Sequence, residues 1–430
     1  MENKTSLKTD LVIIGAGMAG LAGAVFAANR GINAVLVGGA GAFEYASGLL
    51  DLWGLTHPDN GYCKDPWQDL AKIQASRPCH PFSKICPSTI ETAFGELTDV
   101  LGQNGLAYAG MARENSQILT AFGTAKPTFR YPVTMAHNVT ALREKNPTLL
   151  LDFNGLREFR ARFVQQVLSS TWPNIRIAAV EFPQMSGRSE LVTPLMAQAM
   201  ETEQVQDKFA AAVRPHLKGE QFIGVPAILG INTADKIRKR LEGLLGVNLF
   251  EIPTSPISVP GIRLSETFKK ALEDTCVTRL PDQRVLLVPQ NPGKDFVLET
   301  HTHSGTRATR IQAATCLLAT GRFLSKGLIS DRKGIKEPLF NLPVDHSTDR
   351  EHWHAATYFD PGGHAVNLAG ITTDDHFRPL GRDNRAAHET LYAAGSILAG
   401  QDWMRTRSGS GLSIATAFSA IEQIALGRPV

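Results

Sequence analysis

Three glycines near the start of the chain are spaced as a phosphate-binding turn requires. They occupy the first, third and sixth positions of Gly-Ala-Gly-Met-Ala-Gly at residues 15–20. An apolar run at 11–14 precedes them, a helix-compatible stretch at 21–29 follows, and a second apolar run lies at 32–37. The glycines would permit a tight turn, let the backbone approach a pyrophosphate and let the helix pack closely on the strand. The segment therefore predicts a βαβ unit that binds a nucleotide.

The end of the second predicted strand departs from the usual pattern. About 20 residues after the glycines, an acidic residue normally binds the ribose hydroxyls of the adenosine half of a dinucleotide. Gly38 and Gly39 stand at that place, and Glu44 comes later, outside the strand. FMN has no adenosine and would not need the carboxylate, whereas FAD would have to be held in an unusual way.

Two later strands end in a manner typical of flavoproteins. An apolar strand at 315–321 ends Ala-Thr-Gly and follows a predicted β-meander at 284–288, 295–302 and 306–312. The last strand ends Ala-Gly-Ser at 394–396, where the serine replaces an aspartate that would reach the ribityl chain. A serine hydroxyl can still hydrogen-bond a ribityl oxygen. The alternative for each segment is a plain buried strand with no role in binding.

A run of small residues at 408–413 precedes the last predicted helix, 412–425. Free N–H groups at a helix start suit the pyrimidine edge of a flavin, because that edge gains negative charge on reduction. Ser408 or Ser410 could instead be an ordinary N-cap, and the two interpretations are compatible.

Residues that could bind or convert a substrate are less clearly marked. Five arginines lie in Gly- or Pro-flanked loops, and an anionic substrate would need one or two of them, although each alone is better explained as a solvated surface arginine. They are Arg263, Arg322, Arg378, Arg405 and Arg407. Four histidines could by type act as the base that an alcohol oxidation needs. They are His57, His80, His364 and His376. The catalytic residues stay unknown, with His80, His364 and Arg378 as weak candidates.

The composition excludes several classes of protein. The chain has 44 basic and 41 acidic residues, a net charge of +3, which does not suit nucleic-acid binding. Its five cysteines include no C-x-x-C pair, so we expect no metal site and a reducing, cytoplasmic compartment. The uncharged stretch 11–29 is only marginally long enough to span a bilayer, and its glycines are better explained by the nucleotide turn.

The length of 430 residues predicts two or three domains at about 150 residues each. We expect an α/β, Rossmann-like FAD/NAD(P)-binding flavoprotein fold with a β-meander. Its first part would span residues 1–65 and its second part 271–430, within which 331–380 could supply cap elements. An inserted substrate or cap domain would span 66–270, with helices at 152–169 and 233–245.

Six segments, in order along nearly the whole chain, resemble the B subunit of the bacterial anaerobic glycerol-3-phosphate dehydrogenases. They are Ser47–Leu52, His80–Ser83, Gly334–Pro338, Gly370–Asp374, Phe377–Pro379 and Gly395–Asp402. Lys336 stands where the family pattern has arginine.

The resemblance implies oxidation of sn-glycerol 3-phosphate to dihydroxyacetone phosphate, with electrons passed to quinone and onward to fumarate or nitrate. It implies non-covalent FMN, with FAD as the alternative, and two partners: a catalytic A subunit and an iron–sulfur C subunit that docks the complex to the inner membrane. The chain would then be cytoplasmic and peripheral to the membrane. This agrees with the absence of cluster ligands from the sequence, since a partner would have to carry electrons to the quinone.

The motifs and the resemblance together yield one set of candidate cofactor-binding residues. They are Gly15, Gly17, Met18, Ala19, Gly20, Ser47, Gly48, Thr320, Gly321, Gly395, Ser396, Gly409, Gly411 and Leu412. Two other functions remain open. The chain could be an electron-relay protein that binds flavin but no substrate, or a fumarate-reductase-like flavin enzyme acting on another anion.

Overall fold

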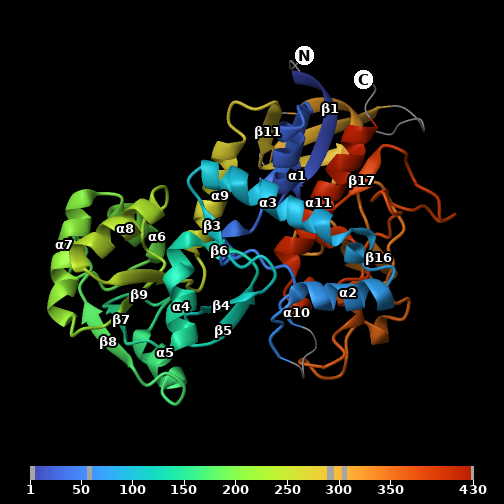
Figure 1. The fold of residues 1–430 in the computed structure, drawn as a ribbon. Coiled ribbons are helices and arrows are strands. Elements are labelled where there is room, and N and C mark those ends of the chain that lie inside the picture. Colours follow the sequence, from blue (N-terminus) through green and yellow to red (C-terminus); the bar gives the residue numbers. More distant parts are fainter. Residues whose placement is uncertain (1–4, 56–60, 288–294, 303–307, 428–430) are drawn as a thin grey trace. The chain divides into compact units, whose positions relative to one another are not determined.

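A computed structural model describes residues 5–55, 61–287, 295–302 and 308–427. The chain forms two compact units (Figure 1). The first unit comprises residues 1–41, 51–100 and 270–430, and the second comprises 42–50 and 101–269. Each unit has its own sheet.

A seven-stranded sheet forms the centre of the first unit. Its order is β11-β2-β1-β14-β13-β12, and β17 also pairs with β14. The strands are β1 (Thr5–Ala16), β2 (Ala34–Ala40), β11 (Val277–Pro281), β12 (Gln283–Leu287), β13 (Phe296–Thr302), β14 (Ala308–Leu318) and β17 (Leu391–Ala393). β1 runs parallel to β2 and β14, whereas β13 runs antiparallel to β12 and β14. The predicted α/β fold with a β-meander is thereby confirmed.

One strand replaces two predicted ones. Residues 308–312 and 315–318 of the segments expected at 306–312 and 315–321 belong to the single strand β14. Residues 306–307 lie outside the described residues, and residues 319–321 follow the strand. The first half of β14 pairs with β13, and its second half pairs with β17. The strand is continuous because β1 pairs with it from Thr309 to Leu318, so no turn separates the meander from the central sheet.

Two apolar helices pack together against this sheet. Helix α1 (Met18–Asn29) is buried from residue 19 to 27, as expected of a helix that is apolar all round. Helix α11 (Gly409–Leu426) lies beside it, and the Phe26 and Phe418 rings meet edge to face with centroids 5.0 Å apart (Figure 1). Arg30, at the end of α1, forms ion pairs with Glu422 of α11 and Glu96.

The remaining regular elements of the first unit are short or peripheral. They are α2 (Pro66–Ser76), α3 (Pro87–Gln103, which ends beyond the unit boundary), α10 (Trp403–Thr406) and the hairpin of β15 (Ile329–Asp331) and β16 (Gly334–Lys336). Short 3₁₀ turns lie at Pro81–Lys84, Arg350–His352, Ala365–Leu368 and Gly395–Ile397.

The second unit contains a four-stranded parallel sheet that the sequence analysis did not predict. Its order is β10-β9-β7-β8, formed by β7 (Thr148–Phe153), β8 (Ile175–Val180), β9 (Phe222–Pro226) and β10 (Asn248–Ile252). The helices are α4 (Ala136–Glu144), α5 (Ala161–Leu168), α6 (Thr193–Met200), α7 (Glu203–Val213), α8 (Ala234–Leu245) and α9 (Val259–Ala271, which ends beyond the unit boundary). Two small antiparallel pairs complete it: β3 (Tyr108–Ala109) with β6 (Tyr131–Pro132), and β4 (Ser116–Leu119) with β5 (Ala125–Thr128).

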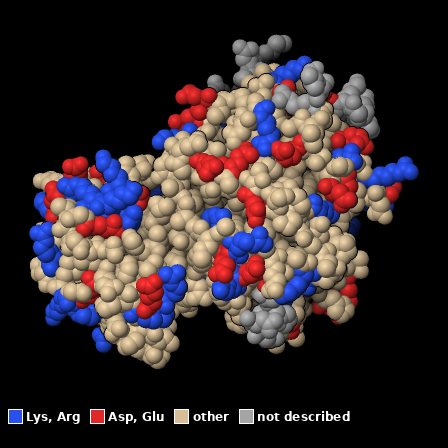
Figure 2. Space-filling view, viewed as in Figure 1, with Lys and Arg blue, Asp and Glu red and all other residues tan. Residues whose placement is uncertain are grey.

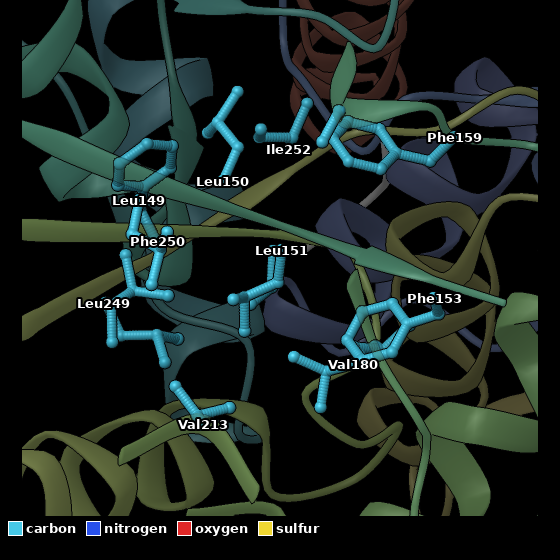
Figure 3. Close-up of a cluster of buried hydrophobic side chains, with 14 of the residues drawn as sticks. Leu149, Leu150, Leu151, Phe153, Phe159, Val180, Val213, Leu249, Phe250 and Ile252 are labelled. Atoms are coloured by element: carbon cyan, nitrogen blue, oxygen red, sulfur yellow. The ribbon is translucent and has the colours of Figure 1, made fainter. Parts of the chain in front are cut away.

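Large apolar side chains from the parallel strands fill the core of the second unit. Leu149, Leu150 and Leu151 of β7 are fully buried, and Leu249 and Phe250 of β10 lie in the same cluster (Figure 3). The helix predicted at 152–169 was therefore partly wrong, because its first two residues end a buried strand and the helix begins only at residue 161. The helix predicted at 233–245 is α8.

The boundaries between the units differ from the predicted ones. Residues 66–100 belong to the first unit, where Glu96 pairs with Arg30 at 2.9 Å and Lys84 Nζ donates to Thr373 Oγ1 at 3.0 Å. Residues 42–50 belong to the second unit, where Ser258 N–H donates to the Glu44 carbonyl. The inserted unit thus begins near residue 101 instead of 66.

Basic and acidic side chains are both spread over the face drawn in Figure 2. This agrees with the small net charge of the chain. In the part of the chain that the structure describes, no helix has the length and apolar character needed to cross a membrane.

Candidate functional site

In the glycine turn between β1 and α1, two glycines are closely packed and the third faces open space. A Cβ atom at Gly15, whose φ is +112°, would overlap the Ala319 carbonyl oxygen. A Cβ atom at Gly20 would overlap the Gly15 carbonyl oxygen, so α1 can approach the turn only because residue 20 is glycine. At Gly17, by contrast, a Cβ atom would have no neighbour within 4 Å. The second glycine therefore faces unfilled space, as the approach of a pyrophosphate requires.

The turn after β14 lies beside this glycine turn. Ala319 N–H donates to the Ile14 carbonyl at 2.9 Å, which joins the carboxyl ends of β14 and β1. Gly321 has a φ of +70°, and a Cβ atom there would lie 3.6 Å from Ser396 Oγ. Thr320 and Gly321 are thus next to both the opening motif and the end of β17.

Gly395 joins the third motif to the first. With a φ of +80°, it lies where a Cβ atom would come within 2.7 Å of the Ala19 methyl group and 3.5 Å of Ser413 Oγ. Its N–H donates to Thr416 Oγ1 at 2.9 Å. Segments more than 370 residues apart in the sequence therefore meet at the carboxyl ends of the parallel strands, where ligands of open α/β sheets bind.

The start of α11 offers unused hydrogen-bond donors. The Gly411 N–H donates to the Asp51 carbonyl, and Ser410 Oγ accepts from the Asp51 N–H at 2.6 Å. Ser408 is the N-cap residue, but its side chain caps no helix N–H. Within the described residues, the N–H groups of Gly409 and Ser410 have no partner. These donors and the helix dipole suit the negatively charged edge of a reduced flavin.

The structure thus brings the predicted cofactor residues of the first unit to one region. Met18 and Leu412 lie in the first turns of α1 and α11, beside the glycines already described. Ser47 and Gly48 belong to the second unit, where Tyr108 Oη donates to the Gly48 carbonyl at 2.8 Å. The open space at Gly17 and the free donors of α11 fit a flavin nucleotide.

His80 is buried as a neutral imidazole. Its Nδ1 accepts the Phe82 N–H at 3.2 Å, so the ring proton of the neutral form must be on Nε2. Burial, assisted by the charge of Arg77, lowers the pKa of His80 to about 4. Such a group can donate a hydrogen bond from Nε2 but is poorly suited to accept a proton at neutral pH.

The other catalytic candidates have structural partners. His364 Nδ1 accepts the Ala355 N–H at 3.0 Å, and His364 Nε2 lies 3.0 Å from the Tyr358 carbonyl. Arg378 forms ion pairs with Asp374 and Glu389, which neutralise its charge. His376 is exposed and contacts Gln423, and His57 lies outside the described residues.

The five candidate arginines fall into two groups. Arg263 is fully buried and pairs twice with Glu251, and Arg378 is paired as described, so neither is free for an anion. Arg322 donates to the carbonyls of Ser396 and Gln401, and burial lowers its pKa to about 10.

The other two arginines precede α11, with Arg405 in the short helix α10 and Arg407 directly after it. Arg405 and Arg407 are half-buried, and neither forms an ion pair with a described carboxylate. Arg407 has a φ of +48°, a conformation uncommon for a residue with a side chain. It is the C-cap residue of α10, a position where left-handed backbone is common.

Gln401 holds the site together in a way that the sequence analysis missed. Its buried amide donates to the carbonyls of Ser396 and Leu398, and its Oε1 accepts the Trp403 N–H. It therefore fixes both the end of the third motif and the start of α10. The only sequence signal was its place in the segment 395–402 that carried the family resemblance.

Comparison with known proteins identifies the family. Residues 10–412 match the model of the FAD binding domain. A Halobacterium salinarum protein, named as the B subunit of a probable anaerobic glycerol-3-phosphate dehydrogenase, is 30% identical over 96% of this chain and 97% of its own length. The B subunit of the Aliivibrio fischeri anaerobic glycerol-3-phosphate dehydrogenase is 28% identical, over 96% of this chain and 95% of its own length. The chain is therefore a flavin oxidoreductase that belongs to the family of anaerobic glycerol-3-phosphate dehydrogenase B subunits.

Proposed function

We propose that this chain oxidises sn-glycerol 3-phosphate to dihydroxyacetone phosphate with a non-covalently bound flavin. The names of its relatives support this substrate. The observation that carries the proposal is the pair of half-buried arginines, Arg405 and Arg407, directly before the helix whose free N–H groups suit a flavin. When bound, the flavin accepts a hydride from the secondary alcohol carbon.

The residues of this chain would bind and orient the two reactants. Arg405 and Arg407 bind the phosphate, because half-buried guanidinium groups that pair with no carboxylate of the described residues are stabilised by an anion. The α11 N-terminus stabilises negative charge at the flavin pyrimidine edge. Arg322 holds the Ser396 carbonyl and so fixes the end of the third motif. Candidate Arg378 has no such role, since its charge is already neutralised.

We further propose that electrons leave through partner proteins. The relatives are named as subunits, which favours a complex with a catalytic A subunit and an iron–sulfur C subunit that reach the quinone pool. Fumarate or nitrate would be the terminal acceptor, and the chain would be a cytoplasmic protein bound to the inner membrane through its partner. The sequence has no C-x-x-C pattern for a cluster of its own.

An electron relay that binds flavin but no substrate is the second candidate. It is favoured by the state of the histidines, because neither His80 nor His364 offers a free basic nitrogen. A fumarate-reductase-like reaction on another anion would use the same arginines with a dicarboxylate.

Anaerobic mixing of the purified flavoprotein with glycerol 3-phosphate tests these functions. Bleaching of the flavin absorbance supports catalysis, and Arg405→Met and Arg407→Met should each raise the half-saturating substrate concentration about 10- to 100-fold, as expected for a lost charged hydrogen bond. Arg332→Met, at an exposed arginine of the β15–β16 turn, is the control and should leave it unchanged.

Each other outcome contradicts the proposal in a different way. Bleaching only after the partner protein is added favours the relay, and bleaching by a dicarboxylate but not by glycerol 3-phosphate favours the third function. If the protein purified from a flavin-replete host contained no flavin, all three would fail.

A further inference from the structure

Gly38, near the end of β2, leaves no room for the acidic side chain that a dinucleotide site normally has there. Gly38 has a φ of +151°, which residues with side chains rarely adopt. A Cβ atom at Gly38 would lie 2.8 Å from the Ala16 backbone nitrogen and 3.1 Å from Gly15 Cα. The end of β2 thus packs directly against the backbone of the glycine turn. This close approach explains why the expected acidic residue is absent.

The adjacent strand places a carboxylate beside the end of β2. β11 runs parallel to β2, with Pro281 opposite Gly38. The next residue is Asp282, whose N–H donates to the Gly38 carbonyl at 3.1 Å. Its Oδ1 lies 3.9 Å from where a Cβ atom of Gly39 would be. The carboxylate therefore lies beside the end of β2, close to where an acidic residue on β2 itself would have begun.

The Asp282 carboxylate has no bonding partner among the residues that the structure describes. It is exposed, and none of the described side chains or N–H groups forms an ion pair or hydrogen bond with it. Asp282 has a φ of +55°, which aspartate tolerates in turns. That conformation explains why an aspartate can stand at this turn, but it does not require the carboxylate to point toward Gly39. A carboxylate can accept hydrogen bonds from two neighbouring hydroxyls at once.

We propose that Asp282 binds the ribose hydroxyls of the adenosine half of the cofactor, in place of the missing residue on β2. The cofactor is then FAD and not the FMN that the family resemblance implies, and the glycines at 38 and 39 no longer favour FMN. This inference rests on the proposed flavin site but not on the identity of the substrate.

Binding of FAD and of FMN to the flavin-stripped protein, followed by quenching of flavin fluorescence, tests the inference. Asp282→Asn keeps the turn conformation but removes the charge, and Asp282→Gly keeps the turn and removes the side chain. Both should weaken FAD binding about 10- to 100-fold, as expected for lost charged hydrogen bonds, and leave FMN binding unchanged.

Asp274→Asn is the matched control. Asp274 also has a positive φ, of +56°, is exposed, and lies before β11 at the opposite end of that strand. The variant should bind both flavins as the wild type does. Thermal unfolding of the flavin-free variants checks that the turns are intact.

Two results would overturn the inference: FAD binding that does not depend on Asp282, or wild-type protein that binds FMN at least as tightly as FAD. Neither result concerns the substrate. If FAD binding depends on Asp282 while glycerol 3-phosphate fails to bleach the flavin, the proposed reaction fails and the inference stands. If glycerol 3-phosphate bleaches the flavin but substitution of Asp282 does not change FAD binding, the inference fails and the proposed reaction stands.

Discussion

The buried imidazole of His80 makes the stability of the first unit depend on pH. The ring is 2% exposed and lies against Trp53 and Phe82, with centroid distances of 5.7 and 5.6 Å. Burial lowers its pKa from 6.5 to about 4. The unfolded chain therefore binds more protons than the native protein between these two values, and the free energy of unfolding falls as pH drops through that window.

We expect this titration to remove about 2 kcal/mol of stability between pH 8 and pH 5. His80→Asn abolishes the titration and retains a side-chain acceptor for the Phe82 N–H. Urea unfolding at both pH values should show a loss about 2 kcal/mol smaller in this variant than in the wild type. His376→Asn, at an exposed histidine, should lose as much as the wild type. An equal loss in His80→Asn would mean that His80 titrates as it does in the unfolded chain.

Residue types revealed the candidates at the site but not their partners. The glycine motif was predictable because its function depends on spacing within six residues. The ion pairs of Arg378 were not, since the choice between a solvated, paired or ligand-binding arginine depends on what the fold places beside it. The same holds for Asp282, which only the pairing of β11 with β2 brings to the site.

At the scale of the element, two glycines of the βαβ unit have different roles. Gly20→Ala places a methyl group on the Gly15 carbonyl, so α1 must move away from β1, and we expect a loss of about 2–3 kcal/mol or more. Gly17→Ala meets no neighbour and should change the stability of the flavin-free protein by less than about 1 kcal/mol. Its methyl group would occupy the space of the pyrophosphate and should weaken flavin binding about tenfold or more.

Denaturant unfolding of the flavin-free variants and flavin titration of those that fold separate the two effects. Gly243→Ala, where a Cβ atom also meets nothing within 4 Å, is a control in α8 of the second unit and should bind flavin normally. A Gly17→Ala protein that binds flavin as tightly as the wild type would show that the cofactor does not approach this turn.

The elements of the first unit were easier to predict than those of the second. β1, α1 and β2 follow one another with short turns, so local pattern alone defines them. In the second unit, the apolar run at 148–153 is a buried strand, but a short apolar run followed by a helix does not distinguish strand from helix by periodicity. Its partner β9 begins at residue 222, so the pairing that defines the sheet is distant in sequence.

At the scale of the whole molecule, the chain has two cores. The boundary near residue 100 was not predictable, because it depends on contacts such as Arg30–Glu96 and Lys84–Thr373 that join distant parts of the first unit. The second unit has its own buried charged pair, in which Glu251 and Arg263 are both at most 1% exposed. From these separate cores we expect that a ligand bound to one unit stabilises mainly that unit.

Hydrogen exchange should reveal this separation. A flavin at 100 times its Kd stabilises the native state by about 2.7 kcal/mol, which slows exchange through unfolding of its unit by about 100-fold. We expect the amides of β1, β14 and α11 to gain this protection when flavin binds, and those of β7 and β9 to exchange at unchanged rates. Gly17→Ala at the same flavin concentration should show reduced protection in the first unit. Equal protection of β7 and β9 would mean that the two units unfold as one, and the cofactor would then stabilise the whole chain.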